Sequence, residues 1–282
     1  MVGRAEEGPL LVIDGDSFAH RAYHGVPKTV RRAGGKAGNA ILGFTNYVVR
    51  LIEAEKPRAV FVGWDKLSEV NWRAKELEGY QGGREMDDEI VEQLDVLPEF
   101  IASFGFLYGK GNALEADDYV ASAATAEEKR GGQALVASGD RDMYQLVSDA
   151  ITVIQPVKAG EVARIDAAGV VERYGVLPEQ VPDFIALRGD PSDKIPGAKG
   201  VGAVTAASLL KTYGTLEAAL GDGKFASEAD ALRLYRRIAT MVRDVKLPAI
   251  KSAPPDWASG AALARKWELN GLADRLEKLA AG

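Results

Sequence analysis

The chain has 282 residues, of which 35 are Lys or Arg and 41 are Asp or Glu, so its formal net charge is −6. It contains no cysteine, which excludes disulfides and thiolate metal sites. No apolar run reaches the roughly 18 residues of a membrane span, and acids stand where a signal peptide needs a basic start. We therefore expect a soluble cytoplasmic protein.

The first half of the chain alternates strand and helix patterns. Apolar runs at residues 10–14, 59–65 and 134–140 each end on an aspartate, and residues 151–156 form a fourth apolar run. Helical patterns cover residues 39–56, 88–105 and 117–130. This alternation predicts an α/β fold, with a twisted, mainly parallel sheet and helices on both faces.

The second half is helical, with patterns at residues 179–190, 202–214 and 228–244 and a terminal pair after Pro254 and Pro255. We expect an α/β core at 1–177 and a helical region at 178–282 that includes the terminal pair. Residues 66–86 are charged and poor in apolar residues. They predict an excursion above the ends of the strands, which we call the arch segment.

Carboxylates gather around the predicted strand ends. Each acidic segment has a structural explanation of its own, as a helix cap or an Asp-rich turn. Together they amount to nine acids in five segments, and this much negative charge needs cations. The nine are Asp14, Asp65, Glu115, Asp117, Asp118, Asp140, Asp142, Asp190 and Asp193.

Oxygen ligands of this kind select hard ions, so Mg²⁺ or Mn²⁺ is the expected metal. Two such ions about 3.5–4 Å apart form the clamp that cleaves phosphodiesters. Nine carboxylates exceed what two partly hydrated ions require, so a third, weaker site is a side hypothesis.

A glycine-rich turn with Gly197, Gly200 and Gly202 precedes a helical pattern. It lacks the Gly-Lys-Ser/Thr ending of a P-loop. On its own it is a tight turn between helices, but Lys194 and Lys199 favour a sequence-independent contact with a nucleic-acid backbone. His20 and His24 stand one helical turn apart. Without a further zinc ligand, local packing or surface contacts explain them better.

The motifs LLVIDGDSFAHRAYH, LEADDYVASAA, ASGDRDMYQLV, LRGDPSDKIPGAKGVGAVTA and WRAKELEGYQGGR resemble the 5′-nuclease domain of bacterial DNA polymerase I, a branch of the flap endonuclease family. The resemblance runs from about residue 9 to about residue 247. Because the chain ends at Gly282, it resembles a stand-alone member without a polymerase domain.

The resemblance implies two metal sites, with Asp118 near both. Its first site matches Asp14, Asp65, Glu115 and Asp117, and its second matches Asp140, Asp142, Asp190 and Asp193. It also implies catalytic roles for Arg84, Arg21 and Asp118, with Arg21 and Tyr23 beside the scissile nucleotide. The glycine turn resembles a helix–hairpin–helix that holds duplex DNA, often with K⁺. The implied DNA contacts are Tyr23, Gln81, Lys194, Gly197, Lys199, Gly200, Val201, Gly202 and Thr205.

Two positions depart from the family pattern. Gln81 stands where the arch usually carries a lysine, leaving Arg84 as the basic residue of that motif. Its presence is expected to slow the chemistry or to shift charge stabilisation to Arg84 and Arg21. Lys194 replaces a usual asparagine and could contact phosphate or pair with Asp190 or Asp193.

The resulting expectation is a monomeric, metal-dependent 5′-3′ exonuclease and 5′-flap endonuclease. Its partner would be branched or 5′-ended duplex DNA, with an RNA primer as a further substrate. One alternative is a catalytically weak module that binds branched DNA, made plausible by Gln81. The other is a phosphatase of the haloacid dehalogenase type, which leaves the acids at 115–118 and the glycine turn unexplained.

Overall fold

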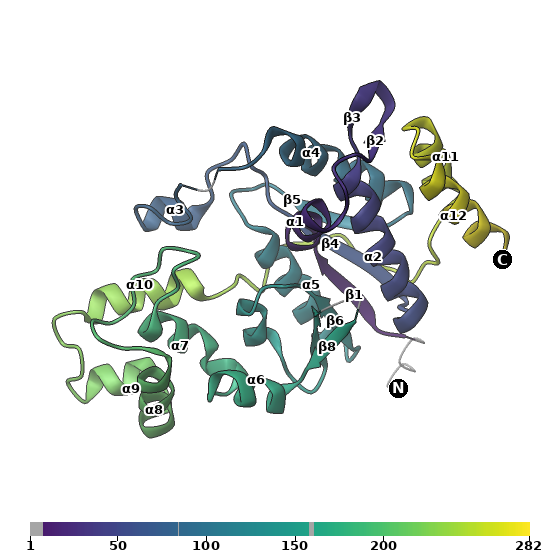
Figure 1. Ribbon diagram of the computed structural model, residues 1–282. Coiled ribbons are helices and arrows are strands. Elements are labelled where there is room, and N and C mark those ends of the chain that lie inside the picture. Colours follow the sequence, from purple (N-terminus) through teal and green to yellow (C-terminus); the bar gives the residue numbers. More distant parts are fainter. Residues whose placement is uncertain (1–7, 84, 158–160) are drawn as a thin grey trace.

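The computed structural model describes residues 8–83, 85–157 and 161–282, and a six-stranded sheet lies at its centre (Figure 1). The strands are β1 (Leu10–Asp14), β4 (Ala59–Trp64), β5 (Leu107–Lys110), β6 (Ala134–Ala137), β7 (Ile151–Pro156) and β8 (Val162–Ile165). Their order across the sheet is β5-β4-β1-β6-β7-β8. Neighbouring strands are parallel except β7 and β8, so the expected mainly parallel sheet is confirmed.

The central strand β1 is apolar throughout because both of its faces are buried. Leu10 and Val12 pack into the core on one face, and Leu11 and Ile13 pack into the core on the other. Continuous apolar runs are typical of such strands. The four predicted strands are all present, whereas the short edge strands β5 and β8 were not predicted.

Helices cover both faces of the sheet (Figure 1). On one face lie α1 (Gly15–Gly25), α2 (Asn39–Glu55) and α4 (Asp88–Ser103), and on the other lies α5 (Ala116–Lys129). A small hairpin joins β2 (Arg31–Arg32) to β3 (Lys36–Ala37). The described part of the arch segment contains one short helix, α3 (Trp72–Glu76).

A second group of helices lies at one end of the molecule, away from the terminal helices (Figure 1). After α6 (Ala167–Tyr174), the chain forms α7 (Val181–Arg188), α8 (Ala203–Tyr213), α9 (Leu216–Gly221) and α10 (Ala229–Ala239). Helix α7 packs against both α8 and α10. Among the described residues, no helix is both long enough and apolar enough to cross a membrane.

The terminal pair, α11 (Trp257–Lys266) and α12 (Asn270–Ala281), packs on the α/β core rather than on the helical region with which it was grouped. Trp267 stacks on Phe100 of α4 with ring centroids 5.2 Å apart. An extended segment leads back to the core, where the Asp256 amide donates to the Phe104 carbonyl at 2.9 Å. The last helix of the second group, α10, ends at Ala239, and the terminal pair follows after the extended segment.

Gly260 tests this docking, because a Cβ there would lie 2.1 Å from Cε1 of the Phe104 ring. We expect Gly260→Ala to lower the free energy of unfolding by about 1–3 kcal/mol through overpacking. Gly271→Ala is the matched control, since a Cβ at Gly271 meets no atom within 4 Å. It should leave the protein as stable or raise stability by about 0.4–1 kcal/mol. Chemical denaturation measures both, and equal effects would contradict the packing described.

Candidate metal centre and nucleic-acid interface

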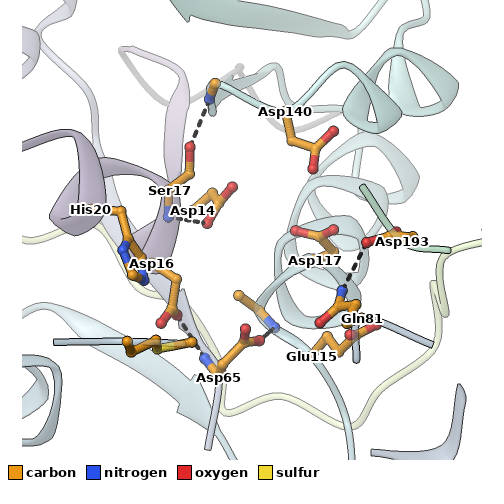
Figure 2. Close-up of a pocket in the computed structure, with 13 residues that line it drawn as sticks. Asp14, Asp16, Ser17, His20, Asp65, Gln81, Glu115, Asp117, Asp140 and Asp193 are labelled. Carbon is orange, nitrogen blue, oxygen red and sulfur yellow. Dashed lines mark hydrogen bonds between the residues drawn. The ribbon is translucent and has the colours of Figure 1, made fainter. Parts of the chain in front are cut away.

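The carboxyl ends of β1 and β4, the start of α5 and the loop after β6 surround one cavity of about 360 Å³ (Figure 2). The arch segment and the turn before α8 complete its wall through Gln81 and Asp193. Carboxylates predominate among the lining side chains. They are Asp14, Asp16, Asp65, Glu115, Asp117, Asp140 and Asp193.

Six of the nine predicted acids therefore share this cavity, and Asp16 joins them. Asp16 was not predicted, because an acid in the first turn of a helix has an ordinary structural explanation. The signal that could have identified it is its position two residues after the strand-end Asp14. His20 also lines the cavity, although local packing was the favoured explanation for it.

Hydrogen bonds through the acids join the elements around the cavity. Asp14 caps α1 by accepting from the Ser17 amide at 3.0 Å, and its other oxygen accepts from the Ser138 hydroxyl at 2.6 Å. Asp16 accepts from the Asp65 amide at 2.7 Å. Asp65 in turn accepts from the Ala116 amide in the first turn of α5, also at 2.7 Å. The starts of two helices are thereby fastened to the ends of β1, β4 and β6.

Burial and mutual repulsion favour the protonated forms of these acids. Burial raises the pKa of Asp14 to about 7, and the nearby charges of Asp140 and Asp65 add to the shift. Burial likewise raises the pKa of Glu115 to about 7, although Arg73 opposes the shift. The pKa values of Asp16 and Asp117 rise well above the ordinary value, first through burial and then through neighbouring carboxylates. The negative charge in the cavity therefore has to be neutralised, either by protons on the acids or by bound cations.

The carboxylates surround a shared space and do not form a ready coordination sphere. Within the described ranges, no three Asp, Glu or His side chains converge closely enough to hold a metal ion as they stand. The donor set nevertheless fits hard divalent ions, because carboxylate oxygens predominate in it.

The other three predicted acids lie outside this lining. Asp190 accepts from the Ser192 amide at 2.8 Å and pairs with Arg188 at 3.3 Å. Burial raises the pKa of Asp142, and the charges of Asp140, Asp193 and Asp190 raise it further. The Asp142 amide donates to the Asp140 carboxylate at 2.8 Å, so Asp142 lies beside the cavity group. The expected second-site acids are therefore neighbours, although only Asp140 and Asp193 face the cavity.

Asp118 has a different environment from its neighbour Asp117. Its side chain is fully buried, and both oxygens accept from the Arg73 guanidinium, at 2.7 and 2.8 Å. They also accept from the amides of Val242 and Glu115. Asp118 thus lies against an arginine, whereas the resemblance implied a position near both metal ions.

The arch segment reaches the cavity through Tyr80 and Gln81. The Gln81 side-chain amide donates to the Asp193 carboxylate at 3.1 Å, and its backbone amide donates to the Asp193 carbonyl at 3.2 Å. The Tyr80 hydroxyl lies 3.3 Å from both Glu115 and Asp193. Gln81 therefore holds a predicted metal ligand. Arg84, expected to be catalytic, lies outside the described residues.

Arg21 and Tyr23 do not line the cavity. The Arg21 guanidinium donates to the Val157 carbonyl, and the side chain borders a separate hollow beside Tyr47 and Arg50. Tyr23 is 2% exposed, and its hydroxyl donates to Asp87 at 2.5 Å. In this conformation neither side chain reaches the acid cavity, and their implied place beside the scissile nucleotide stays a prediction.

The glycine turn joins α7 to α8 and presents polar groups to solvent. Gly197 and Gly200 both have φ near 77°, in the left-handed region. Gly197 also needs to lack a side chain, because a Cβ would lie 2.4 Å from the Gly189 nitrogen. The predicted contacts that are exposed here are Lys194, Lys199, Gly200, Gly202 and Thr205, whereas Gly197 and Val201 are partly buried.

Comparison with known proteins identifies two family models along the chain. Residues 9–175 match the N-terminal resolvase-like domain of 5′-3′ exonucleases, and residues 176–256 match their C-terminal SAM fold. A 5′-3′ exonuclease of Streptomyces coelicolor is 31% identical over 298 residues, covering 94% of this chain and 98% of that protein. DNA polymerase I of Mycobacterium tuberculosis is 38% identical over 251 residues, covering 84% of this chain. The chain spans only 28% of that polymerase's length.

Solved structures share the fold at low identity. T5 5′-exonuclease with bound zinc has a TM-score of 0.67 and 18% identity, covering 96% of this chain and 99% of that one. The catalytic core of Rad2 with a DNA substrate has a TM-score of 0.62 and 16% identity, covering 98% of this chain and 92% of that one. The two matched models together span most of the chain, and the chain belongs to the 5′-3′ exonuclease family.

Proposed function

We propose that this chain is a divalent-metal-dependent 5′-nuclease that cuts 5′ flaps and removes nucleotides from the 5′ ends of DNA. The observation that carries the proposal is the cavity of about 360 Å³, which receives carboxylates from five separate segments at the carboxyl edge of a parallel sheet. Ligands of open α/β sheets bind at this edge. A protein that only bound DNA would gain nothing from so much negative charge in its site.

Mg²⁺ or Mn²⁺ fits the oxygen donors of this cavity, and two ions held there would activate water and stabilise the leaving oxygen of a phosphodiester. Asp14, Asp65, Glu115 and Asp117 lie on the side formed by β1, β4 and α5, and are the proposed residues of one site. Asp140 and Asp193, with Asp142 and Asp190 beside them, are proposed for the other. Asp16, by accepting from the Asp65 amide, orients Asp65 and adds charge to the first group.

The helical region is proposed to hold the duplex near this cavity. Lys194 and Lys199 supply exposed positive charge on either side of Gly197, which suits contacts to phosphates that read no sequence. Backbone carbonyls of the same turn are the proposed K⁺ ligands. The substrate is proposed by analogy with relatives: the Rad2 core binds a DNA substrate, and a T5 flap endonuclease was solved with DNA and metal ions.

Cation binding should release protons, because Asp14 and Glu115 have pKa values of about 7 in the folded protein and ordinary values of 3.8 and 4.5. At pH 6.5 we expect Mg²⁺ to displace about one proton or more per protein, and its apparent affinity to rise from pH 6 to pH 8. For the same reason, the metal-free protein should lose stability as pH rises from about 4 to 7.

Isothermal titration calorimetry in two buffers with different ionisation enthalpies measures the released protons. Asp14→Asn should reduce the release, whereas Asp149→Asn, in an exposed turn away from the cavity, should not. Binding that releases no protons and is independent of pH would show that the ions bind elsewhere.

The activity is tested on a 5′-flap duplex labelled at its 5′ end, with Mg²⁺, Mn²⁺ or a chelator. We expect metal-dependent cuts near the junction, and a loss of at least about 100-fold in Asp140→Asn because a ligand is neutralised without a change of shape. Duplex binding should survive in Asp140→Asn, and Asp149→Asn should cleave normally.

The other outcomes separate the alternatives. Tight flap binding without cleavage in either metal would favour the non-cutting DNA reader. Hydrolysis of a small phosphate monoester, with the flap left intact, would favour the phosphatase. Equal loss of cleavage and binding in Asp140→Asn would contradict the role assigned to this residue.

A further inference from the structure

Arg73, in helix α3 of the arch segment, is a buried cation that pairs with two acids at the start of α5. Its side chain is 3% exposed. Its Nη1 donates to Glu115 at 2.6 Å and to Asp118 at 2.8 Å, and its Nη2 donates to Asp118 at 2.7 Å. The guanidinium therefore binds Asp118 through both terminal nitrogens and Glu115 through one. A two-pronged pairing of this kind fixes the direction of both partners.

The remaining donors of Arg73 fasten it to the end of α10. Its Nε donates to the Ile238 carbonyl at 2.8 Å, and Nη2 reaches the Thr240 carbonyl at 3.3 Å. The C-terminal end of a helix favours a cation because the carbonyl groups point toward it. The plane of the guanidinium is thus set by groups that lie more than 160 residues away in the sequence.

Three residues of the arch segment contact the Glu115 carboxylate. One oxygen accepts from the Asn71 side-chain amide at 2.9 Å, and the other accepts from Arg73 and lies 3.3 Å from the Tyr80 hydroxyl. Glu115 nevertheless lines the acid cavity. The direction of the Glu115 side chain in the cavity therefore depends on Asn71, Arg73 and Tyr80, which do not line the cavity themselves.

Asp118 has no such place on the cavity. Its two oxygens are occupied by Arg73, by the Val242 amide at 2.9 Å and by the Glu115 amide at 3.2 Å. Asp117, one residue earlier on α5, does line the cavity. The two adjacent aspartates therefore face different surroundings, one the cavity and the other a buried arginine.

We propose that Arg73 and Asp118 act as one unit that positions Glu115 for cation binding, with Asp118 as the counter-ion of Arg73 and not a metal ligand. The inference rests on the proposed function, since it concerns the same cavity. It makes Arg73 a positioning residue, which acts on a bound ion only through Glu115. It also means that a change at Asp118 affects the cavity much less when Arg73 is absent.

A double-mutant cycle on Mn²⁺ affinity tests this. Arg73→Gln, Asp118→Asn and the double variant are compared by calorimetric titration and Mn²⁺ electron paramagnetic resonance, at temperatures where each variant is folded. Asp117→Asn, alone and combined with Arg73→Gln, is the matched control. It removes the same charge from the same helix, one position away.

We expect Asp118→Asn to weaken Mn²⁺ binding about 10-fold or more in the unsubstituted protein, and by less than about 3-fold when Arg73 is already Gln. Asp117→Asn should weaken binding by the same factor in both backgrounds. An effect of Asp118→Asn that is equal in both backgrounds would make Asp118 a direct ligand and overturn the inference.

If Arg73→Gln does not fold, Arg73→Lys replaces it in the cycle, because lysine keeps the charge but cannot form the two-pronged pairing. The same cycle is run with it, and Mn²⁺ affinity should fall several-fold while the folded structure is retained. Unchanged affinity in Arg73→Lys would overturn the positioning role. Failure of the unsubstituted protein to bind Mn²⁺ would instead overturn the proposed function and this inference together.

Discussion

Repulsion among carboxylates held at one edge of the sheet is the constraint on which the rest of this structure depends. The chain offsets part of it with hydrogen-bond donors: the Ser17 amide and Ser138 hydroxyl at Asp14, the Ala116 amide at Asp65, and Arg73 behind Glu115. The helix starts add favourable dipoles. Because the pKa values of Asp14 and Glu115 still rise to about 7, the donors offset only part of the repulsion, and bound protons or cations have to offset the rest.

Sheet topology explains why these acids meet. The chain runs from β1 to its neighbour β4 on one side and later returns to β6 on the other, so the connections diverge at β1. Such a switch point opens a crevice at the carboxyl ends of the strands. Asp14 ends β1 and Asp140 follows β6, the two strands that flank this point, while the start of α5 brings Glu115 and Asp117 to the same place.

The sequence predicted what depends on local patterns and missed what depends on distant contacts. The buried strands were evident from their continuous apolar runs. Five cavity acids were evident from their positions at strand ends and a helix start, and the sixth, Asp193, from an Asp-rich turn. The edge strands β5 and β8 are short and partly exposed, so their patterns are weak. The pairing of Arg73 with Asp118 joins residues 45 positions apart, and nothing near either residue indicates it. The docking of α11 and α12 depends on Phe100 and Phe104 in the same way.

The central claim is that the acid cavity is a divalent-cation site, and anomalous diffraction from crystals grown with Mn²⁺ tests it most directly. The account predicts anomalous peaks inside the cavity, within coordination distance of the carboxylates of Asp14, Asp65, Asp117 and Asp140. A cavity that stays empty at saturating Mn²⁺, with peaks only elsewhere on the protein, would contradict it.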